Sequence, residues 1–80
     1  MMHLDIITPE KKLFSGNIKL IQVPGTKGPF EILRNHAAIV STLSSGKIKI
    51  VTNDDQKSFF DIRQGVVEVK NNKVVVLATV

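Results

Sequence analysis

The sequence contains no cysteine, which excludes disulfide bridges and thiolate metal sites. Secreted domains of this size usually need disulfides, so their absence favours a reducing compartment. Tryptophan and tyrosine are absent too, and only four phenylalanines remain to fill a core or an interface. The longest apolar run, residues 74–78, is far too short to cross a bilayer. The N-terminus lacks the basic segment and the long apolar run of a signal peptide, so we expect none.

The residues that are present predict one small globular domain over residues 1–80. Hydrophobic residues make up 42% of the chain, and valine and isoleucine dominate them. Because β-branched side chains suit a pleated sheet better than a helix, this bias favours strands. The net charge of +4 comes from basic residues spread along the chain, with no run longer than Lys11 and Lys12. Such a spread is typical of a solvated surface, although a basic balance also favours acidic partners.

Turn-forming residues divide the chain into segments of about four to eight residues, the length of strands rather than helices. Residues 47–50 alternate lysine and isoleucine, as a half-buried strand should. Asn71 and Asn72 can adopt the left-handed conformations of a tight hairpin turn, which predicts pairing of residues 66–70 with residues 73–78. No window carries a helical stripe. The turn signals are Pro9, Gly16, Pro24, Gly25, Asn35, Gly46, Asn53, Gly65, Asn71 and Asn72.

The predicted fold class is all-β, a flattened two-sheet antiparallel β-sandwich of short strands. A single sheet would leave one apolar face in water, so two sheets should pack face to face or the sheet should close. The core candidates are the apolar residues of the alternating segments. They are Ile18, Leu20, Ile32, Ile48, Ile50, Val67, Val69 and Val75.

The sequence gives no support for catalysis, a cofactor or a metal site. Gly46 and Lys47 would fit a phosphate-binding loop only with a glycine five residues earlier and a serine or threonine next, but Ser41 and Ile48 stand there. The two histidines, His3 and His36, have no cysteine and no suitably spaced acidic pair to complete a metal site. No strand-to-helix nucleophile turn accompanies any serine. We therefore expect a non-enzyme.

Two binding functions stay open on the residues alone. A small β-barrel that binds single-stranded nucleic acid would bring basic side chains to one face and bind with strong salt dependence. An independent adaptor domain would instead bind another protein. The basic residues that the first alternative needs are Lys19, Lys27, Lys47 and Lys49.

Several segments, in order and without insertion, resemble the N-terminal domain of the epsilon subunit of F-type ATP synthases. They are HLDIITPE at residues 3–10, LFSG at 13–16, IQVPGTKG at 21–28, GVVEV at 65–69 and NKVVVLA at 72–78. The resemblance covers essentially the whole chain. Arg34 and Asn35 replace the family's usual Pro-Gly before His36, while Glu31 and Gln64 stand where glycine is common. Since asparagine tolerates left-handed turns, we expect the turn at Asn35 to survive.

The resemblance implies a non-catalytic central-stalk, or rotor, subunit that binds the gamma subunit and the membrane c-ring. It would couple proton-driven rotation to ATP synthesis without a cofactor or nucleic acid, as a peripheral protein on the cytoplasmic face of the energy-transducing (bacterial inner) membrane. The implied c-ring contacts are Thr26, Lys27, Gly28, Pro29 and Phe30. The implied gamma contacts are His36, Ala37, Ser41 and Phe59.

Typical bacterial relatives continue past the last matching strand into a two-helix hairpin that inhibits ATP hydrolysis and can bind ATP. This sequence stops at Val80. We therefore expect the inhibitory hairpin to be absent here, and we do not transfer its inhibitory and nucleotide-sensing roles to this chain.

Overall fold

The computed structural model describes residues 1–80 and contains eight strands and no helix. The all-β prediction is therefore confirmed. The structure has no helix that could span a membrane. The strands are β1 (Met2–Ile7), β2 (Lys12–Val23), β3 (Phe30–Leu33), β4 (Ile39–Leu43), β5 (Gly46–Thr52), β6 (Lys57–Ile62), β7 (Gln64–Lys70) and β8 (Lys73–Thr79).

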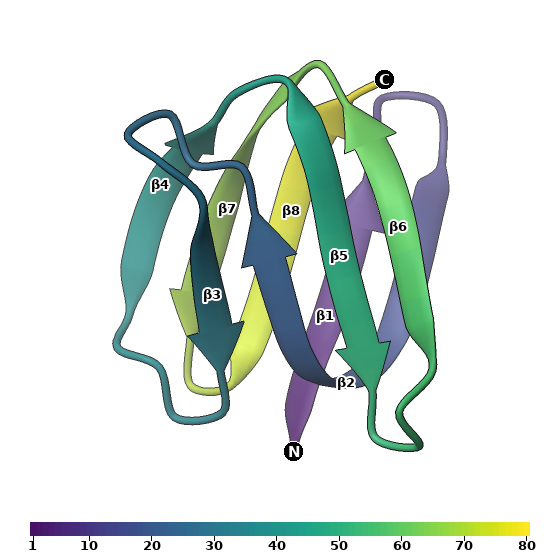
Figure 1. Cartoon of the computed structure of the whole chain (residues 1–80), viewed down its shortest axis with the longest axis vertical. Coiled ribbons are helices and arrows are strands. Elements are labelled where there is room, and N and C mark those ends of the chain that lie inside the picture. The colour runs from purple at the N-terminus through teal and green to yellow at the C-terminus, as the bar shows by residue number, and fades with distance from the viewer.

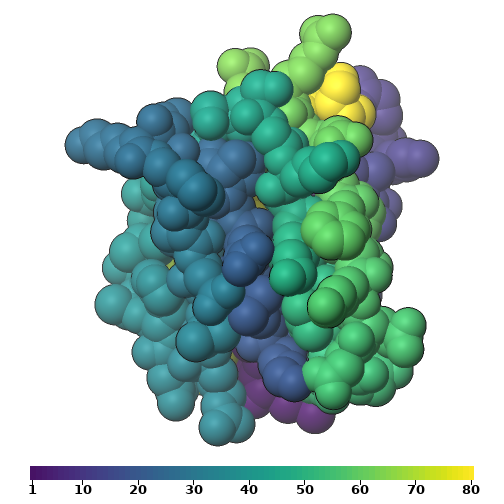
Figure 2. All heavy atoms as spheres, in the orientation of Figure 1, coloured from purple at the N-terminus to yellow at the C-terminus, as the bar shows by residue number.

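The strands form one hydrogen-bonded path, in the order β4-β7-β8-β1-β2-β5-β6, with β3 attached to β2. The path folds over into two layers (Figure 1). The long strand β2 belongs to both, because its first half pairs with β1 and its second half pairs with β3 and β5. We call β4, β7, β8 and β1 the rear layer, and β3, β5, β6 and the second half of β2 the front layer. Figure 2 shows how side chains fill the outer surface of the front layer.

One pairing differs from the antiparallel expectation. β1 and β8 run parallel, with His3 opposite Lys73 and Ile7 opposite Leu77. Every other pair is antiparallel. No turn connects β1 to β8, so the local turn signals that reveal hairpins could not reveal this contact.

The core lies between the two layers and contains sixteen buried hydrophobic side chains. Six of the eight predicted core residues are among them: Ile18, Ile32, Ile48, Ile50, Val67 and Val69. The prediction is wrong for Leu20 and Val75, which are only half-buried. An irregularity between Ile18 and Leu20 breaks the alternation of β2, so that Ile21 and Val23 point inward instead. In β8 the inward positions are Val74, Val76 and Ala78, which turns Val75 outward.

Two glycines expected to mark turns lie inside strands. Gly16 pairs with Leu4 in the middle of β2, and Gly65 pairs with Ala78 in β7. Gly65 is needed for close packing across the sheet, whereas Gly16 is only tolerated within its strand. Neither glycine marks a change of chain direction.

Loops gather at two ends of the sandwich (Figure 1). The connections at residues 8–11, 24–29 and 44–45 and at Arg63 lie at the end that is uppermost in the figure, together with the C-terminus. The connections at residues 34–38, 53–56 and 71–72 lie at the lower end with the N-terminus. We use the names upper end and lower end for these two loop groups.

The predicted hairpin is confirmed, since β7 and β8 pair antiparallel from Gln64–Thr79 to Lys70–Lys73. Asn71 and Asn72 have φ values of 51° and 60°, and Asn35 has φ of 66°, so all three take the left-handed conformation expected of them. At the lower end the Asn35 backbone N–H donates to Asn72 Oδ1 at 2.6 Å, and Asn72 Nδ2 donates to Asn35 Oδ1 at 3.1 Å. These two bonds join the β3–β4 loop to the β7–β8 turn.

We expect Asn72→Ala to destabilise the fold by about 2 kcal/mol, because alanine loses both hydrogen bonds and is strained at positive φ. Asn72→Gly loses the same hydrogen bonds without the strain, so it should be less harmful by about 1 kcal/mol. Urea unfolding followed by circular dichroism measures both variants. Equal stability of the two variants would contradict the assigned strain.

Candidate functional site

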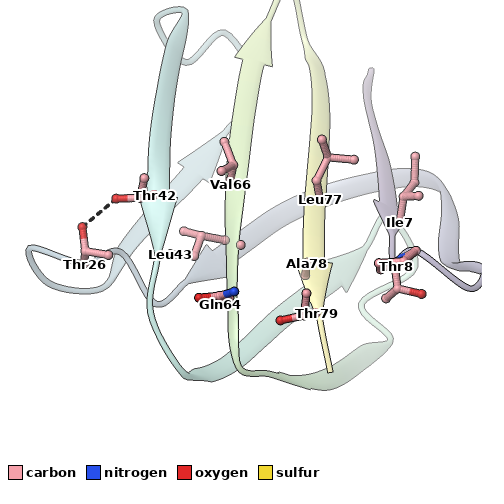
Figure 3. Close-up of a pocket in the computed structure, with 12 residues that line it drawn as sticks. Ile7, Thr8, Thr26, Thr42, Leu43, Gln64, Val66, Leu77, Ala78 and Thr79 are labelled. Atoms are coloured by element: carbon pink, nitrogen blue, oxygen red, sulfur yellow. Dashed lines mark hydrogen bonds between the residues drawn. The ribbon is translucent and has the colours of Figure 1, made fainter.

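The outer surface of the rear layer contains an open groove of about 660 Å³. Figure 3 shows its side chains projecting from β4, β7, β8 and the end of β1, with Thr26 reaching in from the β2–β3 loop. Its lining consists of Ile7, Thr8, Pro9, Thr26, Thr42, Leu43, Gln64, Gly65, Val66, Leu77, Ala78 and Thr79. The groove is therefore apolar along its centre and polar at its rim.

Strand register explains why apolar side chains meet there. Thr42 lies opposite Val66, Val66 opposite Leu77, and Leu77 opposite Ile7. Side chains opposite one another on neighbouring strands project from the same face about 5 Å apart, so these four form a continuous row. Leu77 is 54% exposed and Val66 37%, although both belong to central strands. Exposed large apolar side chains in one cluster are typical of a protein-binding surface.

Hydrogen bonds order the polar rim of the groove. The hydroxyls of Thr26 and Thr42 lie 2.8 Å apart, and the Thr26 backbone N–H donates to the Thr42 carbonyl at 3.1 Å. On the opposite side, the hydroxyl of the buried Thr8 donates to the Lys11 carbonyl at 2.9 Å. The rim therefore keeps a fixed shape, which lowers the entropy lost on binding.

A second row, nearer the lower end, contains Val40, Glu68, Val75 and Asp5 on the same surface. Val40 is 70% exposed and extends the apolar surface toward the edge strand β4. The Asp5 side chain is only 16% exposed, with His3 Nε2 at 3.5 Å and Lys12 Nζ at 3.6 Å. The neighbouring Ser15 hydroxyl, followed by the charges of Lys12 and His3, keeps the pKa of Asp5 below its ordinary value despite partial burial. Asp5 therefore adds a fixed negative charge beside the apolar row.

The five implied c-ring contacts form one loop at the upper end. Gly28 has φ of 127° and its N–H donates to the Gly25 carbonyl at 3.0 Å, which closes a tight turn. Thr26, Lys27, Gly28 and Pro29 are exposed there. Phe30 is half-buried and packs against the core, so its main role is to anchor the end of the loop.

The four implied gamma contacts do not form one cluster. His36 and Ala37 lie in the lower-end loop before β4, where His36 Nδ1 is 2.8 Å from the Ala37 carbonyl. Ser41 lies on β4, but its position alternates with the exposed Val40 and Thr42 and it is half-buried. Phe59 lies on β6, at the opposite end of the strand path from β4, and is 58% exposed. Phe59 and Ser41 therefore lie on different layers of the sandwich.

Reasoning from the sequence missed the residues at the centre of the groove, Val66 and Leu77. One signal was available for Leu77: residues 74–78, which include it, form a continuous apolar run rather than an alternating one. A continuous run indicates a strand that is covered on both faces. The core covers one face of β8, while the outer face, with Leu77 54% exposed, is open.

The basic face required by the nucleic-acid alternative is only partly present. Lys19 pairs with Asp55, and Lys47 Nζ lies 2.8 Å from Asp61 Oδ1. Lys27 lies in the upper-end loop, apart from the strands that carry the other lysines. Phe59 is the one exposed phenylalanine. No group of three or more His, Asp or Glu side chains is placed to hold a metal ion.

Residues 1–80 match the family model described as ATP synthase, Delta/Epsilon chain, beta-sandwich domain. The ATP synthase epsilon chain of Chlorobaculum tepidum is 40% identical over 74 residues, which cover 92% of this chain and 84% of that protein. The ATP synthase epsilon chain of Protochlamydia amoebophila is 39% identical over 75 residues. Those residues cover 94% of this chain, which spans about half (51%) of that relative's length.

Two solved structures share the fold at low sequence identity. One is a chain of the Euglena gracilis mitochondrial ATP synthase, solved as OSCP, F1 and c-ring, with a TM-score of 0.93 and 16% identity. It matches 99% of this chain, which covers 51% of that chain. The other belongs to the central stalk and c-ring of the Tetrahymena thermophila mitochondrial ATP synthase, with a TM-score of 0.83 and 19% identity. It also matches 99% of this chain, which covers 63% of that chain.

Proposed function

The chain belongs to the family of ATP synthase delta/epsilon-chain β-sandwich domains, and on that basis we propose that it is a non-catalytic rotor subunit of an F-type ATP synthase. The observation that carries the proposal is the match over all 80 residues, together with 40% identity to an epsilon chain of which this chain covers 84%. The partners are the gamma subunit and the c-ring. The chain transmits rotation between them, and ATP is made elsewhere in the assembly.

The groove on the rear layer is the proposed binding surface for the gamma subunit. Stable interfaces combine an apolar, well-packed centre with a polar rim that stays in contact with water. The row of Val66, Leu77 and Ile7 supplies such a centre, and Thr26 and Thr42 supply part of the rim. His36 and Ala37 extend this surface at the lower end, while Phe59 on the opposite layer lies outside it.

The upper-end loop of residues 26–30 is the proposed contact with the c-ring. Lys27 is exposed at its tip and makes no ion pair within the chain, so its charge is free to meet carboxylates or carbonyls on the ring. The tight turn at Gly28 limits the flexibility of the loop. A stiff contact suits a loop that transmits force to its partner without deforming.

The two proposed surfaces are joined directly. Thr26, at the start of the ring-facing loop, is hydrogen-bonded through both its backbone and its side chain to Thr42, which lines the groove. Behind them, 39 backbone hydrogen bonds within the strands hold the two layers as one body. Torque applied at the loop therefore reaches the gamma-binding surface through covalent and hydrogen-bonded structure, without a hinge. In this role the protein lies at the cytoplasmic face of the energy-transducing membrane, held there by its partners.

Co-purification with a co-expressed gamma subunit, followed by native mass spectrometry, tests the proposal. We expect a stable one-to-one complex that survives gel filtration. A folded chain that fails to bind gamma, while the full-length Chlorobaculum tepidum epsilon chain binds its own gamma under the same conditions, would overturn it.

Replacing Lys27 with glutamate should weaken coupling at the ring without affecting the fold, because the side chain is exposed and unpaired. We expect proton pumping driven by ATP hydrolysis to fall about threefold in the assembled enzyme at low salt, with partial recovery at high salt as charges are screened. Lys49→Glu on the front layer is the matched control. Unchanged pumping at both salt concentrations would remove Lys27 from the ring contact.

A further inference from the structure

Large apolar side chains are exposed on both outer faces of the sandwich. Val40, Val66 and Leu77 are exposed on the rear layer and belong to the surface proposed for gamma. On the front layer Leu33 is 49% exposed and Phe59 is 58% exposed. Because the two faces point in opposite directions, one partner bound at the rear groove leaves the front side chains in water.

The front side chains form one strip across neighbouring strands. Leu33 on β3 lies opposite Leu20 on β2, and Leu20 lies opposite Val51 on β5. Leu20 and Val51 are half-buried and fill the space between their neighbours. In the next row Phe59 on β6 lies opposite Lys49, diagonal to Val51. We call Leu20, Leu33, Val51 and Phe59 the front strip; the strands that carry them form the face shown in Figure 2.

A second groove, of about 500 Å³, continues the front strip at the lower end. Met1, Met2, Ile18 and Leu33 supply its apolar lining. Lys19, Arg34, Asn35 and Asn53 supply its polar lining. The apolar surface is therefore longer than the strip alone, and hydrogen-bond donors border it.

The unpaired charges around the front strip are positive on balance. Asp61 pairs with Lys47 and Asp55 pairs with Lys19, while Glu31 and Asp54 keep their charges and accept only from the Gln22 amide and the Thr52 hydroxyl. Arg34, Lys49 and Lys57 flank the strip without an ion pair. An apolar strip bordered by unpaired cations is complementary to an apolar segment bordered by carboxylates.

The spacing of the strip matches a helix. Leu33 and Val51 are separated by two strand spacings, or about 10 Å. Residues i and i+7 of an α-helix are also about 10 Å apart, and residues i+3 or i+4 fall between them on the same face. Three apolar side chains of a helix laid across β3, β2 and β5 would therefore meet Leu33, Leu20 and Val51 in turn.

We propose that the front layer is a second docking surface, for an amphipathic helix of a protein whose apolar stripe is flanked by aspartate or glutamate. The helix crosses the strands over the front strip, and its carboxylates face Arg34, Lys49 and Lys57. Because the rear groove lies on the other layer, the chain binds this helix and its rear-face partner at the same time. The inference rests on the front face alone and is independent of the identity of the rear-face partner.

Two synthetic helical peptides with the same leucine stripe, one flanked by glutamate and the other by lysine, serve as probes in fluorescence anisotropy with the full chain. We expect the glutamate peptide to bind at least about tenfold more tightly. Combining Leu33→Ser with Phe59→Ser should weaken binding of the glutamate peptide about tenfold. Combining Arg34→Gln with Lys57→Gln should reduce the salt dependence of that binding. The matched rear pair, Val40→Ser with Leu77→Ser, should leave the affinity for the glutamate peptide unchanged.

Three results would overturn the proposal: equal affinity for both peptides, no binding of either one, or equal weakening by the front and rear pairs. Vesicles containing phosphatidylglycerol form a further arm. Vesicle binding that depends on Leu33 and Phe59, with no peptide binding, would assign the face to a membrane instead. All variants are checked by circular dichroism, so that loss of binding is read only from folded chains.

Discussion

Leu77→Asp is expected to reduce binding to the gamma subunit about 100-fold or more while the domain stays folded. Leu77 lies at the centre of the apolar row, between Val66 and Ile7, and is 54% exposed in the free chain. A carboxylate there is stable in water, but docking of a partner would remove that water without supplying a counter-charge. The cost of such an uncompensated buried charge is about 3–5 kcal/mol, which corresponds to a loss of 100-fold or more.

Isothermal titration calorimetry with purified gamma subunit measures the effect. The backbone of Leu77 remains in the β8 ladder, so circular dichroism and thermal unfolding should change little. Phe59→Asp on the front layer is the matched control, since it introduces the same charge at a residue of similar exposure outside the groove. Equal losses from both substitutions would contradict the assignment of gamma to the rear face, and full binding by Leu77→Asp would exclude the groove.

Gly65→Ala should be strongly destabilising for a change of a single methyl group. A Cβ at Gly65 would lie 2.6 Å from the Leu77 carbonyl oxygen and 3.2 Å from Ala78 Cα. Both contacts are with the backbone of β8, which cannot move aside as a flexible side chain could. Overpacking of this kind costs about 1–3 kcal/mol and occasionally more. In a domain whose total stability is about 5–10 kcal/mol, that is a large fraction.

Gly16→Ala is the natural control for this prediction. The added Cβ at Gly16 would meet only the Phe14 ring, at 3.5 Å, which is an ordinary contact. Both glycines lie within strands, so intrinsic strand preference affects the two substitutions similarly. Urea unfolding of the two variants should differ by about 2 kcal/mol or more. If Gly65→Ala unfolds at the same urea concentration as Gly16→Ala, the backbone clash is not real.

Local patterns predicted the parts of this fold that local chemistry determines. The asparagine pair at residues 71–72 predicted the β7–β8 hairpin, and alternation at residues 47–50 predicted which isoleucines are buried. The prediction that Leu20 is buried was wrong because an irregularity in β2 shifts the inward face by one residue. The alternating pattern does not reveal where such a shift occurs. The parallel contact of β1 with β8 joins opposite ends of the sequence and leaves no local trace.

The candidate sites also differ in how far local sequence patterns reveal them. The loop at residues 26–30 could be named as a candidate from the sequence, because glycine and proline define its turn and the family resemblance implies a role for it. The groove was missed because it depends on which strands are neighbours: Thr42, Val66 and Ile7 come from three distant segments. Phe59 was grouped with Ser41 by sequence, yet the order of strands separates them. Contacts between distant segments are the information that a single sequence carries least directly.

The parallel pairing of β1 and β8 also determines when the protein can fold during its synthesis. Within this domain β1 is made before the other strands, but its rear-layer neighbour β8 is made after all of them. Until then the outer segments β4 and β7 have no connection to β1, and the apolar residues of β1 have only β2 beside them. Chains that depend on such distant pairings fold slowly and expose unpaired strand edges meanwhile. The nascent chain therefore passes through a stage in which a chaperone that holds extended apolar segments has the whole of β1 available to bind.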